Sequence, residues 1–180
     1  MRTAIVTGAN RGVGREVARQ LVAQGYRVIL TSRDERKGKG ALSELKQQLG
    51  ASSPGDLLYH QLDVTNEESI QRLYRFIHSE FTAIDVLVNN AAILLDQYGR
   101  VSQTPLDIYR TTMGTNVYGP LRLCQVFLPL MLAQNYGRIV NISSGAGCIK
   151  EMVDDMTAYR LSKIALNGLT QMLADSVKGT

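Results

Sequence analysis

Short segments rich in Val, Ile and Leu alternate with longer amphipathic segments along this chain of 180 residues. The alternation is typical of parallel β-sheets, in which a helical crossover joins each strand to the next. Five βα units of this kind predict an α/β fold with a doubly wound parallel sheet. The predicted strands are 2–7, 26–31, 57–62, 84–89 and 137–142, and the predicted helices are 12–24, 35–49, 66–80, 105–133 and 155–177.

The composition is that of one soluble domain. Hydrophobic residues make up 44% of the chain, and no segment reaches the roughly 18 to 20 consecutive apolar residues of a membrane helix. The net charge is +4, but Lys and Arg are dispersed among acidic residues and Trp is absent, so we expect no nucleic-acid partner. We therefore expect a single domain over residues 1–180 that acts on a small molecule, without a membrane.

Cysteine and histidine usage argues against a metal site and against a disulfide framework. Cys124 and Cys148 are the two cysteines, and they form no CxxC pair. His60 and His78 lack metal-ligand spacing with each other and with either cysteine. The pattern indicates packed thiols in a reducing compartment, and we expect the cytoplasm.

A glycine-rich loop directly follows the first predicted strand. The run Thr7–Gly14 has glycines at positions 8, 12 and 14 and leads into a predicted helix. Glycine permits positive φ angles and a close approach of backbone to a pyrophosphate, which the N–H groups at the helix N-terminus bind. The other interpretation is a tight turn, but the strand, loop and helix context favours a dinucleotide site.

The end of the second predicted strand bears on the choice of dinucleotide. An acid there usually binds the ribose hydroxyls of NAD, whereas an arginine accommodates the 2′-phosphate of NADP. Here Arg33 follows the strand, and Arg33 and Arg11 could together bind that phosphate. Asp34 leaves two alternatives open, a helix cap or a ribose contact. The pattern favours NADP(H) over NAD(H).

Tyr159 and Lys163 lie four positions apart in the last predicted helix, so they share one face. An ammonium beside a phenol favours the phenolate and makes the phenol a better proton donor to a substrate oxygen. Such a pair also occurs by chance on exposed helices, so the spacing by itself is weak. The interpretation of the Tyr159–Lys163 pair therefore depends on the other motifs of the chain.

Taken in order, these motifs resemble the classical short-chain dehydrogenases/reductases, which have a Rossmann fold with the strand order 3-2-1-4-5, and within that family most closely the carbonyl reductases. The motifs fall at the carboxyl ends of the predicted strands or on the helix that faces that edge. They are the loop Thr7–Gly14, Leu62–Val64, Asn89–Ala92, Asn116, Ser143–Ser144 and the Tyr159–Lys163 pair.

The resemblance implies an oxidoreductase that interconverts a ketone or aldehyde and an alcohol. Tyr159 would be the general acid in reduction and the base in oxidation, and Lys163 would hold the nicotinamide ribose. Ser144 would bind the carbonyl oxygen, with Ser143 the weaker candidate. Pro120 lacks the N–H that would bond the carbonyl of Asn116 in a regular helix, so that carbonyl would be free to hold the water of a proton relay. A simple kink of the helix at the proline is the alternative.

The resemblance also assigns a set of cofactor contacts. Asp63 and Val64 would contact the adenine, and residues 90–92 would line the nicotinamide half. Alternatively, Asp63 caps a turn and the paired asparagines satisfy turn backbone. The full set of expected contacts is Gly8, Asn10, Arg11, Gly12, Val13, Gly14, Arg33, Asp63, Val64, Asn90, Ala91, Ala92, Tyr159 and Lys163.

One departure from the family pattern concerns the C-terminal part. The family continues with a sixth strand, a Pro-Gly turn and a seventh strand, and this chain contains none of them. A fragment of a longer protein is the favoured explanation, and a genuine short form is another. The alternative functions are therefore a cofactor-binding fragment and an interaction module.

Two further expectations concern partners and substrate. The resemblance implies a homodimer or homotetramer formed through helices 105–133 and 155–177. Ile149, Met152 and Met156 indicate an apolar wall beside the substrate but do not identify it. The physiological direction of the reaction also stays open.

Overall fold

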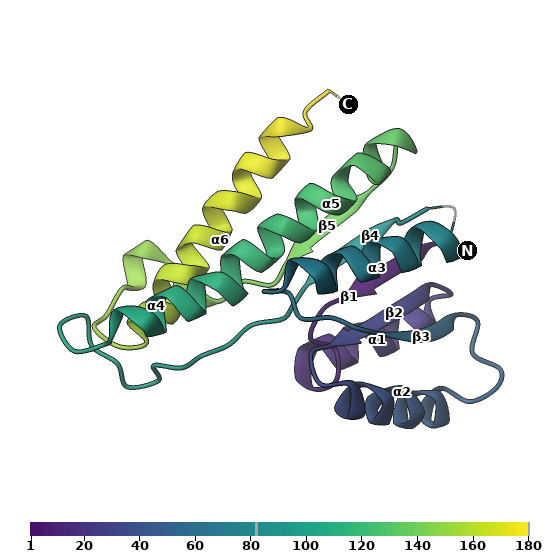
Figure 1. The fold of residues 1–180 in the computed structure, drawn as a ribbon, viewed down its shortest axis with the longest axis horizontal. Coiled ribbons are helices and arrows are strands. Elements are labelled where there is room, and N and C mark those ends of the chain that lie inside the picture. The colour runs from purple at the N-terminus through teal and green to yellow at the C-terminus, as the bar shows by residue number, and fades with distance from the viewer. Residues whose placement is uncertain (82, 180) are drawn as a thin grey trace. The chain divides into compact units, whose positions relative to one another are not determined.

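The computed structural model describes residues 1–81 and 83–179, which divide into two compact units (Figure 1). Unit 1 comprises Met1–Ala91 and Leu123–Val140, and unit 2 comprises Ala92–Arg122 and Asn141–Thr180. The expectation of one domain stays a prediction.

Unit 1 is built on a parallel sheet with the strand order β3-β2-β1-β4-β5. Ile5 in the central strand pairs with Ile29 on one side and with Leu87 on the other, and all three side chains are fully buried. Strands buried on both faces read as continuous apolar runs, which is why the sequence pattern located them. The α/β fold and the strand order are confirmed. The strands are β1 (Thr3–Val6), β2 (Arg27–Ser32), β3 (Asp56–Gln61), β4 (Val86–Asn89) and β5 (Arg138–Asn141), of which Asn141 belongs to unit 2.

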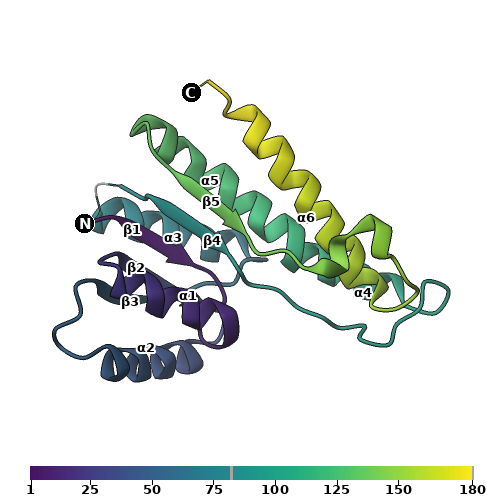
Figure 2. The ribbon, with the colours of Figure 1, turned by 180° about the vertical axis from the view of Figure 1, so that it is seen from behind.

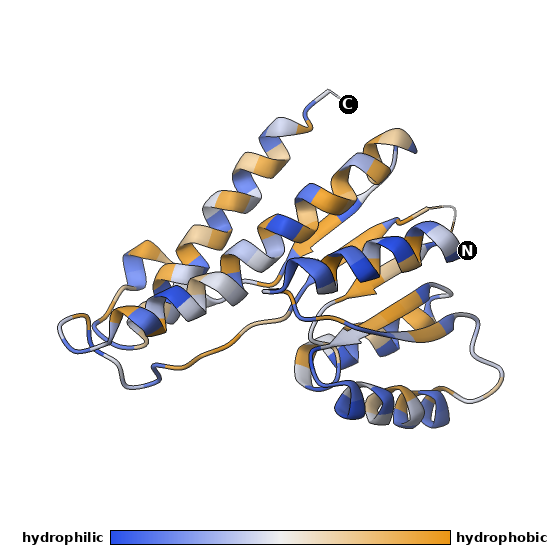
Figure 3. Ribbon diagram, in the orientation of Figure 1, coloured by the Kyte–Doolittle hydropathy of each residue, from blue (hydrophilic) through white to orange (hydrophobic). Residues whose placement is uncertain are grey.

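Helices cover both faces of this sheet. Figures 1 and 2 show α1 (Gly12–Ala23) and α3 (Glu67–Glu80) on opposite faces, and α2 (Glu35–Leu49) packs beside α1. Most of α5 (Gly119–Ala133) belongs to unit 1 and lies beside α3, where the rings of Phe127 and Tyr74 are 6.4 Å apart. Figure 3 shows strongly hydrophobic strands beside helices with hydrophilic stretches, as expected for amphipathic helices over a buried sheet.

Side-chain caps define where two of these helices begin. The Asp34 carboxylate accepts a hydrogen bond of 2.9 Å from the backbone N–H of Lys37, and Asn66 accepts one of 2.8 Å from that of Ser69. Both residues occupy the N-cap position, where a short polar side chain satisfies a backbone donor that the helix leaves unpaired. Of the two alternatives for Asp34, the structure shows the helix cap.

Unit 2 is organised around α6 (Thr157–Ser176), which contacts α4 (Leu106–Met113), the π-helical segment η1 (Gly114–Tyr118) and the 3₁₀ segment η2 (Gly145–Gly147). A second 3₁₀ segment, η3 (Ile149–Glu151), precedes α6. Among the described residues, no helix is both long and apolar enough to cross a membrane.

The helix predicted over 105–133 is interrupted in its middle, just before Pro120. The N–H of Gly119 bonds the carbonyl of Gly114, five residues back, so the α-helical register is interrupted by η1. Pro120 follows directly and has no N–H to restore the regular ladder. The helical path continues through three segments, α4, η1 and α5.

Candidate active site

The glycine loop of unit 1 joins β1 to α1 and includes two positive φ angles, 63° at Gly8 and 58° at Gly12. A Cβ at Gly8 would lie 2.8 Å from the Cα of Ala91, so a side chain there would collide with backbone. A Cβ at Gly12 would meet no atom within 4 Å, so the loop is open on that side. Backbone is therefore accessible at the start of α1, as binding of a pyrophosphate requires.

Thr7 and Asn90 hold this loop in place. The Thr7 hydroxyl accepts backbone N–H bonds from Asn90 at 2.9 Å and Ala91 at 3.0 Å. The Asn90 amide donates to the carbonyls of Thr7 at 2.8 Å and Gly8 at 3.2 Å. The asparagine thus satisfies loop backbone, and its contact with a cofactor stays a prediction. Sequence reasoning missed the role of Thr7, because its partners lie over 80 positions away.

The start of α1 has the properties of an anion-binding helix terminus. Arg11 occupies the N-cap position with an extended backbone and forms no side-chain cap, and the first turn contains no acid. Gly14 packs inward beside Asn90, Asn10 is half-buried, and Val13 is 61% exposed. The residues present therefore fit a dinucleotide pyrophosphate.

Arg33 follows β2, the neighbour of β1 in the sheet, so it lies at the same sheet edge as the glycine loop. Its side chain is exposed, and no acid within the described residues pairs with it. Asp34 instead caps α2, and the Lys37 backbone N–H lowers the pKa of its carboxyl. The exposed guanidinium, rather than the acid, is therefore available to a ligand at this edge.

Asp63 and Val64 lie directly after β3. One carboxylate oxygen of Asp63 accepts from the Thr65 N–H at 2.9 Å and from the Thr65 hydroxyl at 2.7 Å. Val64 is only 7% exposed. Asp63 thus organises the turn before α3, and the adenine contacts of both residues stay predictions.

Tyr159 and Lys163 lie on one face of α6 in unit 2, as predicted. The Lys163 Nζ is 5.4 Å from the centroid of the Tyr159 ring and donates a 2.8 Å hydrogen bond to the carbonyl of Ile142. Lys163 is 2% exposed, and this burial lowers the pKa of its ammonium. Tyr159 is half-buried. A desolvated ammonium beside a phenol is an arrangement suited to proton transfer.

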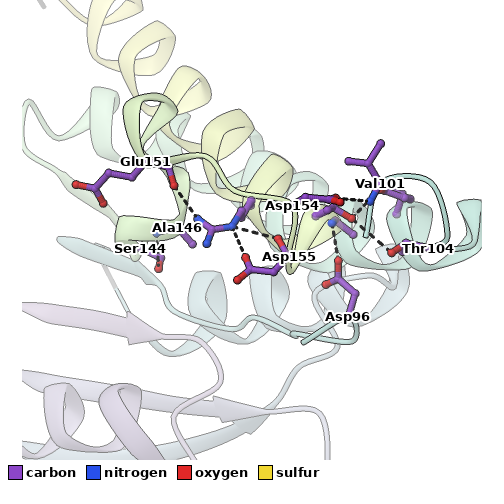
Figure 4. Close-up of polar contacts among 12 residues, drawn as sticks. Asp96, Val101, Thr104, Ser144, Ala146, Glu151, Asp154 and Asp155 are labelled. Carbon is purple, nitrogen blue, oxygen red and sulfur yellow. Dashed lines mark hydrogen bonds and ion pairs between the residues drawn. The ribbon is translucent and has the colours of Figure 1, made fainter. Parts of the chain in front are cut away.

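Ser144 lies after β5, and its hydroxyl accepts a 3.1 Å hydrogen bond from the Ala146 N–H at the start of η2 (Figure 4). The side chain is exposed, and its hydroxyl hydrogen can be donated to another group. The Ser143 hydroxyl is buried and has no hydrogen-bond partner among the described residues. Ser144 is therefore the serine that this segment presents outward.

Gly147 lets the segment that carries Ser144 pack closely on α6. A Cβ at Gly147 would lie 2.9 Å from the backbone carbonyl carbon of Lys163. The Asn167 amide also donates to the Gly147 carbonyl at 3.3 Å. The absence of a side chain at Gly147 thus determines how near the serine segment comes to the lysine.

We expect Gly147→Ala to destabilise unit 2 by about 1–3 kcal/mol, because the added methyl group overpacks a backbone contact. Urea denaturation would measure the change in the free energy of unfolding. Gly145→Ala is the matched control, since a Cβ at Gly145 would meet no atom within 4 Å. Equal stability of the two variants would contradict this prediction.

Asn116 lies in η1, and its side chain joins two other segments of unit 2. The amide exchanges a pair of 2.9 Å hydrogen bonds with the backbone of Ile93 and donates at 3.0 Å to the Ser162 hydroxyl. Ser162 in turn donates to the carbonyl of Tyr159 at 2.7 Å. Asn116 is buried and supports α6 through its side chain, and the water relay at its carbonyl stays a prediction. Ala92, beside Ile93, is exposed.

Asp96 is a residue that sequence reasoning missed. The polar run 96–104 reads as a loop, yet Asp96 is buried and accepts a 2.6 Å hydrogen bond from the Ala158 N–H. No local pattern signals this contact, since its partners are 62 positions apart. Among the described residues, no group of three or more His, Cys, Asp or Glu side chains could hold a metal ion.

Known proteins resemble this chain in sequence and in fold. The family model for short chain dehydrogenase matches residues 2–180. A (+)-neomenthol dehydrogenase of Arabidopsis thaliana is 35% identical over 99% of this chain and 68% of its own length. Carbonyl reductase [NADPH] 1 of Bos taurus is 35% identical over 97% of this chain and 62% of its own length. The chain thus spans about two thirds or less of these curated relatives.

A solved structure of a metagenomic short-chain oxidoreductase in complex with NADP superposes with a TM-score of 0.87 at 33% identity. The match covers 98% of this chain and 76% of that chain. The fold of this chain therefore occurs in a protein whose structure was solved in complex with NADP.

Proposed function

The chain belongs to the short-chain dehydrogenase family, and on that premise we propose that it interconverts a ketone or aldehyde and the corresponding alcohol, using NADP(H). The observation that carries the proposal is the buried Lys163 beside Tyr159 on α6, with Ser144 on the segment packed against the same helix. The carbonyl reductase and neomenthol dehydrogenase relatives support this class of reaction.

Each catalytic side chain has a separate task in the proposed reduction. The Ser144 hydroxyl donates a hydrogen bond to the carbonyl oxygen and orients the substrate. The Tyr159 phenol transfers its proton to that oxygen as negative charge develops on it. The Lys163 ammonium stabilises the phenolate that remains, because opposite charges attract strongly where water is excluded.

The glycine loop and Arg33 would hold the dinucleotide, which supplies the hydride when bound. We infer that the phosphorylated form is preferred, because Arg33 is exposed while the neighbouring Asp34 is engaged as a helix cap. A guanidinium forms charge-assisted hydrogen bonds with phosphate, whereas a carboxylate would repel it.

Arg33→Ala should raise the KM for NADPH by roughly 10- to 100-fold, the loss expected for hydrogen bonds to a charged group. The KM for NADH should change little, because NADH has no 2′-phosphate. Steady-state kinetics with both cofactors would measure this, and Arg36→Ala in α2 is the control. An equal effect on both cofactors would contradict the proposed phosphate contact.

The proposed activity is tested by following NADPH absorbance with a panel of ketones and aldehydes, and NADP⁺ reduction with the corresponding alcohols. Turnover that requires Tyr159 supports the oxidoreductase. A second candidate function is cofactor binding without turnover. The motivation is that this chain matches only 62% of the length of the carbonyl reductase. NADPH binding with no turnover across the panel would favour it.

We also propose that the protein forms a homodimer or homotetramer through the helical segments 105–133 and 155–177. The support is a row of side chains along α6 that includes exposed apolar residues. Leu161 is 49% exposed and Met172 is 65% exposed, and Gly168 lies between them. Light scattering would test this. Cytoplasmic location is likewise a proposal, consistent with two free cysteines.

A further inference from the structure

The helix that carries Tyr159 lacks an ordinary N-terminal cap. Met156 precedes the helix with φ 45° and ψ 39°, a left-handed conformation, and its side chain forms no capping hydrogen bond. The first turn contains no acid. A helix leaves its first backbone N–H groups without intrahelical partners, and a side chain at the N-cap usually accepts one of them. Met156 therefore provides no side-chain acceptor for these N–H groups.

Asp96 provides that acceptor from 62 positions earlier in the sequence. Its Oδ2 accepts from the backbone N–H of Ala158 at 2.6 Å (Figure 4). Ala158 is the second residue of α6 and directly precedes Tyr159. Asp96 is 6% exposed, and its Oδ1 has no hydrogen-bond partner among the described residues. The helix N-terminus is thus the main stabilising contact of this buried carboxylate.

Asp96 is itself held in a tight turn. The Gly99 N–H bonds the Asp96 carbonyl at 2.8 Å, and a Cβ at Gly99 would lie 2.8 Å from the Cβ of Asp96. A second carboxylate also joins the segment 96–101 to the segment 154–158. The Val101 N–H donates to Asp154 at 2.8 Å (Figure 4). Asp154 contacts the loop, whereas Asp96 contacts the helix.

We propose that Asp96 is a positioning residue for Tyr159, replacing the missing N-cap of α6 and keeping its first turn, with the phenol, in place for proton transfer. The inference rests on the proposed function. Without an acceptor for the Ala158 N–H, the first turn frays, because helix ends open at low free-energy cost. Misplacement of a catalytic group by about 1 Å can lower turnover by about 100-fold.

Three variants test the proposal. Asp96→Ala should lower kcat by roughly 10- to 100-fold, leave the KM for the carbonyl within about twofold, and speed amide hydrogen exchange at 157–160. Asp96→Asn retains a side-chain oxygen that accepts the same N–H, so it should restore kcat and protection close to wild type. Asp154→Ala removes the hydrogen bond from the Val101 N–H but leaves the cap of α6 intact. This variant should keep wild-type kcat and wild-type protection.

The exchange measurement separates this inference from the proposed function. If the wild-type chain has no turnover, the oxidoreductase proposal fails, and protection at 157–160 still decides whether Asp96 caps α6. The inference is overturned if Asp96→Ala keeps wild-type protection or wild-type kcat, or if Asp154→Ala loses as much as Asp96→Ala. If Asp96→Ala does not fold, loss of kcat or protection in Asp96→Asn overturns it.

Discussion

Tyr159→Phe is expected to lower kcat for carbonyl reduction by roughly 10²- to 10⁴-fold, the usual contribution of a general acid. The change removes one oxygen from a half-buried side chain, so the variant should remain folded. NADPH binding should be largely retained, because the glycine loop and Arg33 are unchanged. The defect should thus appear in kcat and not in cofactor affinity.

Stopped-flow or steady-state absorbance would measure turnover, and fluorescence titration would measure NADPH affinity. Tyr98→Phe is the matched control, since Tyr98 is 87% exposed and lies in unit 2. We expect wild-type turnover from that variant. Substantial turnover by Tyr159→Phe would remove Tyr159 from the proposed mechanism.

Lys163→Met is expected to remove activity and yet leave the protein at least as stable as the wild type at neutral pH. Methionine has nearly the length of lysine but carries no charge. Burial lowers the pKa of Lys163, so holding the ammonium in the folded chain costs free energy. Loss of the 2.8 Å hydrogen bond to the Ile142 carbonyl offsets part of the gain. Turnover should fall because nothing then stabilises the phenolate.

The burial of Lys163 makes the free energy of unfolding of the wild type depend on pH. The unfolded lysine keeps its proton up to about pH 10.4, whereas the folded lysine releases it at lower pH. Between those two values the unfolded state binds more protons, so the wild-type free energy of unfolding rises with pH. Lys163→Met lacks this rise, and the advantage of the variant should shrink as pH increases toward 10.

Thermal or urea unfolding of both proteins from pH 7 to 10 would measure the difference. Lys150→Met is the control, because Lys150 is exposed and should show the wild-type dependence. A difference between Lys163→Met and the wild type that does not vary with pH would show that the ammonium carries no burial penalty.

The strands and most helices were predictable because their signals are local. Apolar runs mark buried parallel strands, and β1 to β5 lie within one or two residues of their predicted ranges. The helix 105–133 is the exception. Its interruption at η1 depends on which backbone carbonyls each N–H reaches, and apolar periodicity does not report that.

The residues of the candidate site also include some whose placement is set locally and some whose contacts form only in the folded chain. The positions of Tyr159 and Lys163 on one helix face follow from their spacing alone. The side-chain contacts of Asn116 with Ile93 and Ser162, and of Asn90 with Thr7, join segments far apart in the sequence. Such pairings arise only when the chain has folded, so no local pattern predicts them.

The sequence by itself determined the fold class, the position of the glycine loop and the shared helix face of Tyr159 and Lys163, because helical and strand periods place nearby residues on common faces. Only the tertiary structure decided that Asp34 is a helix cap, that Lys163 is buried, and that Asp96 caps the helix carrying Tyr159. These depend on burial and on hydrogen bonds formed where the folded chain brings each backbone donor to its acceptor.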